Sequence, residues 1–399
     1  GNDFARNVLI NQNGGTFRHL TDSAYYTFQS NLLNNPSTWM DNFIGSTIHG
    51  GLMMVEDAVS SILISPLTNQ FRRLRKKPVP DDIAEFDDVL TGLKGFWAGM
   101  KDGWQGAAHV IRTGERQGYK GNRYDPISSS RIPDELKINN PLTKATYRFN
   151  TSELKDTWVG KMIDGIGFLQ SIPMKALAAG DEIVGNTIAR MALHKEGSIY
   201  VKNRVRQLRE QGKTDEEIRA IVTPEVNDFV NTQPADIFAN VKEHKDMIQF
   251  TYKWDKTMML DKAYAAVNKT LNNPYIRFMV PFANTLTKIF DQGASRIPGL
   301  NFISPQFYKD ITRGGKHLDR AASRLVVGGT ALGMGYERAS QDLMTGSGPA
   351  NFTDKAALMK TGWQPYSFVF EKDSIPHSIL KKIGALTDVS EGNGKIYIS

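Results

Sequence analysis

The 399-residue chain contains no cysteine. That excludes a disulfide framework and any metal site built on cysteine thiolates. Glycine and proline occur at about average frequency, which excludes collagen-like and low-complexity classes. No run of 18 apolar residues free of charge is present, so we expect no conventional transmembrane helix. The absence of cysteine fits a reducing compartment, or a protein whose stability comes from packing and assembly.

Familiar catalytic signatures are missing as well. The sequence has no G-x-x-x-x-G-K-[ST] loop, no G-x-G-x-x-G turn, no H-E-x-x-H helix, no EF-hand loop and no G-x-S-x-G elbow. Its seven histidines are scattered singly, without the spacing of metal ligands. We predict no catalytic residues, no cofactor and no metal site in this chain, and leave open an enzymatic domain elsewhere in a longer one.

One predicted helix contains several side chains of the types that carry out acid–base catalysis. Asp181 and Glu182 are followed by Arg190 and His194 in a stretch rich in small residues. Because no second carboxylate stands at a usable spacing, we interpret these residues as structural rather than catalytic.

Both ends look cut from something longer. The chain begins GNDFARNVLI, without an initiator methionine or a signal-peptide pattern, and ends GKIYIS in a strand-like run. We expect a fragment of a larger polypeptide.

Apolar residues recur at helical spacing through most of the sequence. A helix start at Asn34–Pro36 opens a long apolar-rich stretch, which Glu56 and Asp57 interrupt. Short strand-like runs appear only near the end, at 366–370 and 395–398. We predict a mainly α fold: an extended multi-helix assembly with long loops and a small strand-containing C-terminal part.

Composition shifts divide the chain into five segments. We predict an N-terminal helical region at 1–111, a long connecting loop at 112–150, a central helical region at 151–250, a basic helical region at 251–344 and a tail of loops and short strands at 345–399.

Glycine, proline and capping residues predict helix ends and close helix contacts within these segments. Five glycines at spacings of three and four, from Gly92 to Gly106, predict a helix face that approaches a neighbour closely. Gly212 ends a helix, and Thr214 with Glu217 forms a capping box that opens the next. By the same logic Pro224 is expected to start a further helix.

The segment 272–298 is the most apolar of the predicted helices. Pro274 suits its first turn, and Pro281 is expected to kink it. A second predicted helix, 306–337, begins basic and ends in a glycine-rich apolar run. Burial against protein and insertion into lipid both remain open for these helices. The candidate residues for membrane or subunit packing are Ile276, Met279, Val280, Phe282, Leu286, Phe290, Val326, Val327, Gly329 and Gly333.

The net charge of +7 is localised. Residues 251–330 carry 12 Lys/Arg against 5 Asp/Glu, while the rest of the chain balances. A basic segment suits an anionic partner such as nucleic acid or lipid headgroups, although an ordinary solvated face is an equal alternative. The candidate DNA-facing cations are Arg72, Arg73, Arg75, Lys76, Lys77, Lys309, Arg313, Lys316, Arg320 and Arg324.

Four segments together carry a resemblance. They are NLLNNPSTWMDNFIGS at 31–46, KALAAGDEIVGNTIARMAL at 175–193, NNPYIRFMVPFANTLTKIFDQGASRIP at 272–298 and KTGWQPYSF at 360–368. In this order they resemble segments of very large virion proteins of tailed bacteriophages. That group includes the internal core or DNA-ejection proteins of short-tailed phages and the large polyvalent proteins.

The resemblance implies a function. It implies a structural virion protein stored inside the capsid, which is released with the genome and forms a homo-oligomeric conduit that carries DNA across the host cell envelope. The implied partners are further copies, other ejection or core proteins, the portal, double-stranded DNA bound without sequence preference, and the host inner membrane. The alternatives are a membrane-inserting module, a fixed core or portal-associated protein, and a non-catalytic part of a larger virion enzyme such as a peptidoglycan hydrolase or a polymerase.

Overall fold

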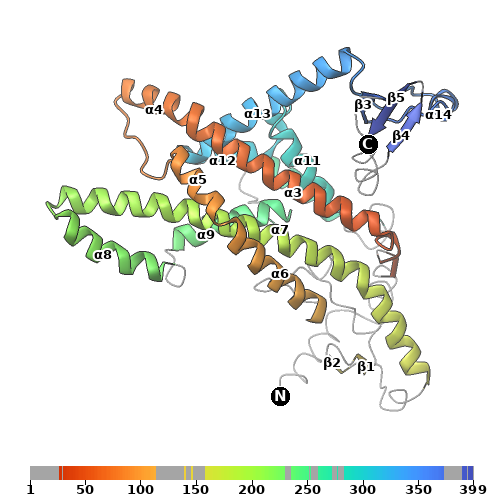
Figure 1. The fold of residues 1–399 in the computed structure, drawn as a ribbon, viewed down its shortest axis with the longest axis horizontal. Coiled ribbons are helices and arrows are strands. Elements are labelled where there is room, and N and C mark those ends of the chain that lie inside the picture. Colours follow the sequence, from red (N-terminus) through yellow and green to blue (C-terminus); the bar gives the residue numbers. More distant parts are fainter. Residues whose placement is uncertain are drawn as a thin grey trace. The chain divides into compact units, whose positions relative to one another are not determined.

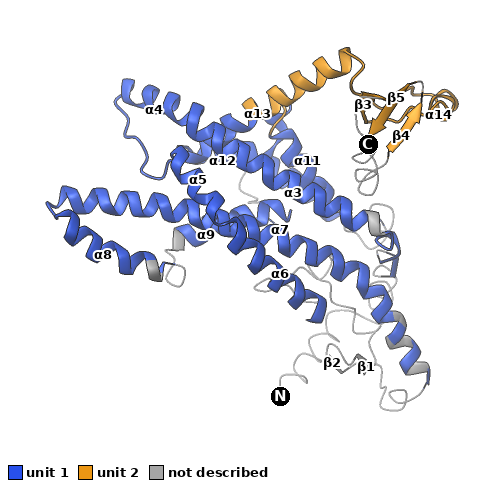
Figure 2. Cartoon of the chain, viewed as in Figure 1, with its two compact units in different colours: residues 1–295, 300–324 blue, residues 296–299, 325–399 orange. Residues whose placement is uncertain are grey.

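A computed structural model describes residues 27–28, 30–113, 139–140, 145–146, 158–229, 235–250, 252, 259–271, 276, 283–372, 389–392 and 394–398. The described part is mainly α-helical with one small three-stranded sheet, which confirms the predicted fold class. The chain forms two compact units (Figure 2). Unit 1 comprises residues 1–295 and 300–324, and unit 2 comprises 296–299 and 325–399. The predicted 112–150 loop lies largely outside the described residues.

Unit 1 is built around one very long helix, α7 (Trp158–Glu210), against which α3, α5, α6, α8 and α9 pack (Figure 1). The other elements of this unit are α3 (Pro36–Val59), the π-helical turn η1 (Ser60–Ile64), α4 (Ser65–Leu74), α5 (Phe86–Lys94), α6 (Phe96–Thr113), the two-residue strands β1 (Asn139–Asn140) and β2 (Ala145–Thr146), α8 (Asp215–Asp228), α9 (Ala235–Ile248), α10 (Met259–Leu271), α11 (Ala283–Ala294), the 3-10 turn η4 (Asn301–Ile303), α12 (Pro305–Arg313) and the start of α13 (Gly315–Ser340).

Glycines let α5 and α6 lie very close to α7, as their spacing predicts. A Cβ atom added at Gly99 would lie 2.7 Å from the Cα of Thr187, and one at Gly103 would lie 2.7 Å from the carbonyl oxygen of Ile183. No side chain can occupy that space without a shift of the backbone. At Gly99 and Gly103, α6 therefore meets the backbone of α7 directly.

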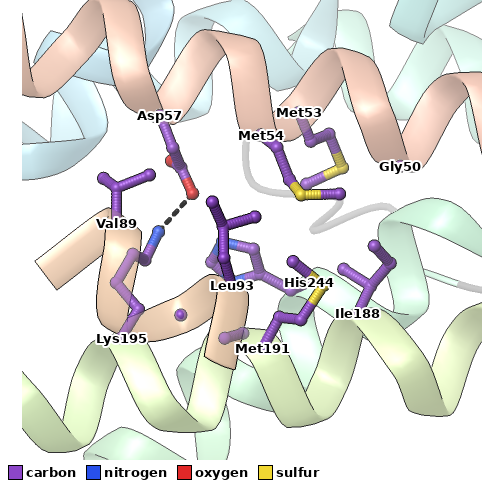
Figure 3. Close-up of a pocket in the computed structure, with 12 residues that line it drawn as sticks. Gly50, Met53, Met54, Asp57, Val89, Leu93, Ile188, Met191, Lys195 and His244 are labelled. Atoms are coloured by element: carbon purple, nitrogen blue, oxygen red, sulfur yellow. Dashed lines mark hydrogen bonds and ion pairs between the residues drawn. The ribbon is translucent and has the colours of Figure 1, made fainter. Parts of the chain in front are cut away.

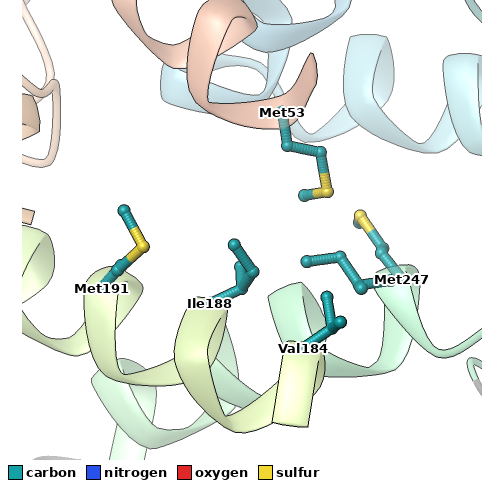
Figure 4. Packing of buried hydrophobic residues seen from close by; sticks show 6 residues of the cluster. Met53, Val184, Ile188, Met191 and Met247 are labelled. Atoms are coloured by element: carbon teal, nitrogen blue, oxygen red, sulfur yellow. The ribbon is translucent and has the colours of Figure 1, made fainter. Parts of the chain in front are cut away.

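The apolar core of unit 1 is small and rich in methionine. Its central cluster contains Met53 of α3, the α7 residues Val184, Ile188 and Met191, and Met247 and Ile248 of α9 (Figure 4). Methionine fills irregular gaps between helices, so this cluster tolerates the unequal spacing around α7.

One predicted helix boundary is wrong, because Pro224 lies within α8 and starts no new helix. The predicted capping box at Thr214 is confirmed, and Gly212, predicted to end a helix, has a positive φ of 77° just after α7. Residues 158–210 form a single helix, in which a Cβ added at Gly197 would lie 3.1 Å from the ring of Phe229. Between residues 235 and 271 the chain forms two helices, α9 and α10.

The two helices singled out in the sequence also differ from expectation. The predicted basic helix 306–337 breaks at Gly314, whose φ of 68° favours glycine, and this separates α12 from α13. In the segment 272–298 the regular helix is α11, which begins at Ala283, two residues after Pro281. The expected kink at Pro281 lies outside the described residues.

Unit 2 contains the end of α13, α14 (Phe352–Lys360) and an antiparallel sheet in the order β3-β5-β4. The strands are β3 (Phe368–Glu371), β4 (Val389–Gly392) and β5 (Lys395–Ile398); β3 and β5 match the two predicted runs. Val369 and Ile396 are buried in this small unit. Close approach in α13 falls on Gly328, where an added Cβ would meet Arg296, and not on the predicted Gly329 and Gly333 pair.

Candidate functional site: buried ion pairs and outward apolar faces

Arg324 is the centre of a charge network inside unit 1. Its side chain has no exposed surface, its Nη1 lies 2.6 Å from the Oδ2 of Asp310, and its Nε lies 3.5 Å from the Oε2 of Glu56. Gln306 donates to the other oxygen of Asp310 at 3.1 Å. Burial opposes the charge of Arg324, but the carboxylates of Asp310 and Glu56 outweigh burial and raise the pKa of the guanidinium. Arg324 therefore stays charged and ties three helices, α3, α12 and α13, together.

A second group joins α4 to α13 around the buried carboxylate of Asp319. Ser65 and Thr68 each donate a hydroxyl hydrogen bond to it at 2.9 Å, and the Nη2 of Arg72 lies 3.1 Å away. Arg72, a predicted DNA contact, is thus engaged within the protein.

A third group lies between α3, α7 and α9. Lys195 forms an ion pair with Asp57, and Arg320 donates to the Nε2 of His244 at 3.1 Å, while the Nδ1 of His244 faces the carbonyl of Asn240 at 2.8 Å. Burial, Arg320 and Lys195 together lower the pKa of His244 to about 3, so this histidine is neutral near pH 7. Burial raises the pKa of Asp57, but Lys195, Arg320 and His244 more than offset this and hold it at about 2.

A small cavity adjoins this group (Figure 3). Met53, Met54, Ile188 and Met191 line most of it, with Asp57, Lys195 and His244 at one side. Its volume of about 30 Å³ suits one or two water molecules and is far below that of a substrate pocket. Although acid, base and histidine meet here, a reactant has no room to approach them.

The cations of α12 and early α13 are paired with acids from distant helices. Lys309 and Arg313 lie 3.2 Å and 2.9 Å from Glu243 of α9, and Lys316 lies 3.2 Å from Glu196 of α7. Burial raises the pKa of Glu243, but Lys309, Arg320 and Arg313 outweigh it and hold the pKa at about 2. Lys309, Arg313 and Lys316 therefore have acidic partners within the fold.

These contacts correct the predicted DNA-facing set. Arg320 and Arg324 are buried and cannot face DNA in this fold, because their charges balance acids and a histidine inside unit 1. Four predicted cations do remain exposed at the end of α4, namely Arg73, Arg75, Lys76 and Lys77, which we call the basic tip. In the described part of the chain none of the four forms an ion pair.

The backbone explains how the basic tip is presented. The amide of Lys77 donates to the carbonyl of Arg72 at 2.9 Å, and Lys76 has a positive φ of 54°, a helix ending that glycine usually provides. Pro78 follows directly, so the helix cannot continue. Cations at this position also interact favourably with the carbonyl end of the helix.

Helix α11 turns its polar side inward and its apolar side outward. Lys288 is 3% exposed and donates to the carbonyl of Phe250 at 2.8 Å. Asp291 has no exposed surface and accepts from Tyr252 at 2.9 Å and from Ser304 at 2.6 Å. Leu286 and Phe290, by contrast, are 52% and 54% exposed. Of the two alternatives left open for this helix, burial within this chain does not hold for Leu286 and Phe290, whereas contact with a lipid layer or another subunit stays a prediction.

The same inversion occurs along α3, η1 and α4. Glu56, Ser61 and Ser65 are buried, and Asp57 is turned toward Lys195. Glu56 and Asp57 thus do not interrupt the helix, which runs on through the π turn. The side chains that point outward are large and apolar; we call Ile48, Val55, Ile62, Leu63, Leu67, Phe71 and Leu74 the outer stripe.

Helices α5 and α6 repeat the pattern with tryptophan. Their glycine side faces α7, while Leu90, Trp97, Trp104 and Ile111 are exposed, Trp97 to 76%. These four residues are spaced by seven, a signal that could have been read from the sequence.

The other predicted packing residues have mixed positions. Val326 is exposed, Ile276, Val327 and Gly329 are half-buried, and nothing lies within 4 Å of a Cβ added at Gly333. Met279, Val280 and Phe282 lie outside the described residues. Asp181 and Glu182, considered for catalysis, are buried and bonded to Asn42 and Lys245, and Arg190 pairs with Asp102.

No group of three or more histidine, aspartate or glutamate side chains could hold a metal ion in the part of the chain that is described. Within the described residues one continuous helical stretch, Thr38–Leu74, is long and apolar enough to cross a membrane, judged by length and composition alone. Only 28% of its most apolar 18-residue segment is buried inside the protein. Glu56 and Asp57 fall within this stretch, which therefore contains no charge-free run of 18 residues.

Comparisons of the chain with known protein families, with curated proteins and with solved structures give no match.

Proposed function

We propose that this chain is a structural protein of a tailed-phage particle, released with the genome, whose copies assemble into a conduit for DNA across the host cell envelope. The observation that supports it is the inverted organisation of unit 1: charged side chains such as Arg324 and Asp291 inside, large apolar side chains such as Trp97 and Phe290 outside. Apolar surface of this extent is normally covered by a partner.

Copies of the same chain are the proposed partner. A conduit needs repeated, rigid subunits, and buried ion pairs between helices give a defined register to a subunit whose apolar core is small. The resemblance to internal virion proteins adds further copies, other core or ejection proteins and the portal as neighbours. In this proposal the chain has no catalytic role.

DNA contact in the proposed conduit falls to the basic tip. Its four exposed cations can neutralise phosphates, and such contacts carry no sequence information. The cations of α12 and α13 that the sequence predicted to face DNA have no part in this contact, because they are paired within unit 1.

The decisive experiment compares cryo-EM maps of full particles with maps of particles triggered to release their DNA. Density for this chain should fill the head near the portal before release and be absent afterwards. Density that remains in place would replace the proposal with a fixed core or portal-associated protein.

Assembly can be measured separately by sedimentation velocity of the 399-residue chain. We expect an oligomer, which Trp97→Asp with Trp104→Asp shifts toward the monomer, since both side chains are exposed and their loss leaves the fold intact. Phe352→Asp, an equally exposed site in unit 2, is the matched control. A wild-type chain that stays monomeric at high concentration would exclude self-assembly through these faces.

A further inference from the structure

The outer stripe and the basic tip form one continuous surface along α3, η1 and α4. Between Asn42 and Asn69 the sequence has no lysine or arginine, and its two acids, Glu56 and Asp57, are turned inward to Arg324 and Lys195. At 1.5 Å per residue this uncharged outward face is roughly 40 Å long. The basic tip follows immediately at its end.

The π turn keeps this surface on one side. Up to Ile62, which lies within the turn, the stripe advances by sevens from Ile48 and Val55. From Leu63, also within the turn, the spacing is four, four and three, through Leu67, Phe71 and Leu74. A π turn inserts one extra residue into the helix, which brings the second row into line with the first. Without it, the two apolar rows would point in different directions.

We propose that this surface docks on an anionic lipid bilayer, with α3, η1 and α4 lying in the plane of the membrane and the outer stripe dipping into its apolar layer. A helix with one apolar side and cations at the headgroup level is the arrangement that binds such interfaces. The proposal goes beyond the conduit and does not depend on it.

The charges decide between docking and spanning. To cross the bilayer, α3 would carry Glu56 and Asp57 into lipid. Either both acids would lose their ion pairs with Arg324 and Lys195, or those partners and their helices would enter the lipid as well. Charged groups at that depth are costly unless they are paired. Lying in the plane leaves every one of these ion pairs in place, so the long apolar helix acts as an anchor and not as a span.

The charges also decide between lipid and other occupants. A DNA duplex would satisfy the basic tip but offers nothing apolar to the outer stripe. A second copy packed stripe against stripe would bring its own basic tip and uncharged stripe, because Glu56 and Asp57, the two acids between Asn42 and Asn69, are turned inward. An anionic bilayer matches both parts at once.

The cysteine-free sequence makes a direct test possible. Single variants Val55→Cys, Ile62→Cys, Leu67→Cys and Phe71→Cys of the full chain accept one environment-sensitive fluorophore each, at positions already exposed. Phe238→Cys, equally exposed on α9, is the matched control. The probes are vesicles of phosphatidylcholine alone and vesicles rich in phosphatidylglycerol.

We expect a blue shift at the four stripe positions with the anionic vesicles, and none at Phe238. Quenchers placed at different lipid depths should report one similar, shallow depth for all four labels. Changing Arg73, Arg75, Lys76 and Lys77 to Gln should weaken vesicle binding by about fivefold per residue at low salt. Labels at the stripe positions whose emission does not change when anionic vesicles are added would overturn the proposal.

Three further results would also overturn it. A depth profile that is deepest at Ile62 and shallow at the ends would show a spanning helix. Equal binding to neutral vesicles would remove the role of the basic tip. Blue-shifted labels before any lipid is added would show that another copy covers the outer stripe. None of these results bears on the release of the chain with the genome.

Discussion

Arg324 and Asp310 form an ion pair, 2.6 Å between Nη1 and Oδ2, in which neither side chain has any exposed surface. A buried pair of this kind contributes little net stability, but each partner depends on the other. Removing Arg324 takes from Asp310 and Glu56 the arginine charge that both of them contact in the interior. The pair therefore fixes how α12, α13 and α3 meet, which the small methionine cluster alone would not do.

The first prediction follows from this dependence. Arg324→Met should lower the free energy of unfolding of unit 1 by about 3–5 kcal/mol, because it strands two buried carboxylates. Chemical denaturation followed by circular dichroism measures the change. Arg206→Met is the matched control: its partner Asp81 is exposed, so the loss should stay under about 1 kcal/mol.

A combined variant separates the pair from its surroundings. Arg324→Met with Asp310→Leu and Glu56→Gln should recover most of the stability, because no unpaired charge then remains. If the single and the combined variants are equally unstable, the loss comes from packing and the ion pair has no special role.

The second prediction concerns the backbone contact between α6 and α7. Gly99→Ala should destabilise unit 1 by about 1–3 kcal/mol, since the new Cβ would lie 2.7 Å from Thr187 and force the helices apart. Gly51→Ala in α3 meets nothing within 4 Å and should instead be neutral or stabilising by up to about 1 kcal/mol. Thermal melts of both variants give the comparison, and equal behaviour would mean that the close approach is not needed.

Local features of the fold could be predicted from the sequence. The glycine row of α5 and α6, the start of α3, the capping box at Thr214 and the two strands around Val369 and Ile396 depend on neighbours within a few residues. Helix breaks were harder. The Gly314–Gly315 pair that ends α12 is a turn signal, which the predicted single helix 306–337 did not take into account, and Pro224 is accommodated inside α8.

The direction in which each helix faces could not be predicted. Periodicity finds an apolar side and a polar side, and the usual assumption places the apolar side inward. In α11 the opposite holds, and α3 buries Glu56 beside Met53 while it exposes Ile48 and Val55. The reason is that Lys288, Asp291 and Glu56 have partners far away in the sequence. The same long-range pairing hides Arg320 and Arg324, which local charge had assigned to DNA.

The third prediction uses the pH dependence of stability. Buried beside Arg320, His244 has a pKa of about 3 in the folded state, against 6.5 for a free histidine. Below pH 6.5 the unfolded chain therefore binds a proton at this histidine that the folded chain does not bind. The free energy of unfolding, which has its full value above pH 6.5, consequently decreases as the pH falls toward 3. The slope for one proton is about 1.4 kcal/mol per pH unit.

Replacing this histidine isolates its share. His244→Asn should flatten the stability curve between pH 6.5 and 4.5 by about 2–3 kcal/mol relative to wild type, whatever its effect at pH 7. His317, whose pKa is lowered to about 4 by burial and Arg320, remains in both proteins and cancels in the comparison. A wild-type His244 ring signal that titrates near pH 6.5 by NMR would contradict the buried neutral state.

The last prediction concerns DNA. Binding of duplex DNA by the chain should be independent of sequence and should weaken with salt, because only phosphates are contacted. Changing the basic tip, Arg73, Arg75, Lys76 and Lys77, to Gln should reduce the slope of log affinity against log salt by about 0.9 for each lost contact. Fluorescence anisotropy of a labelled duplex at several salt concentrations measures that slope.

The matched control changes Lys309, Arg313 and Lys316 to Gln. Because these cations are paired with Glu243 and Glu196, their loss should leave the slope unchanged. If the control lowers the slope and the tip variant does not, then unit 1 opens α12 toward DNA, and the charge network described here is not its DNA-bound state.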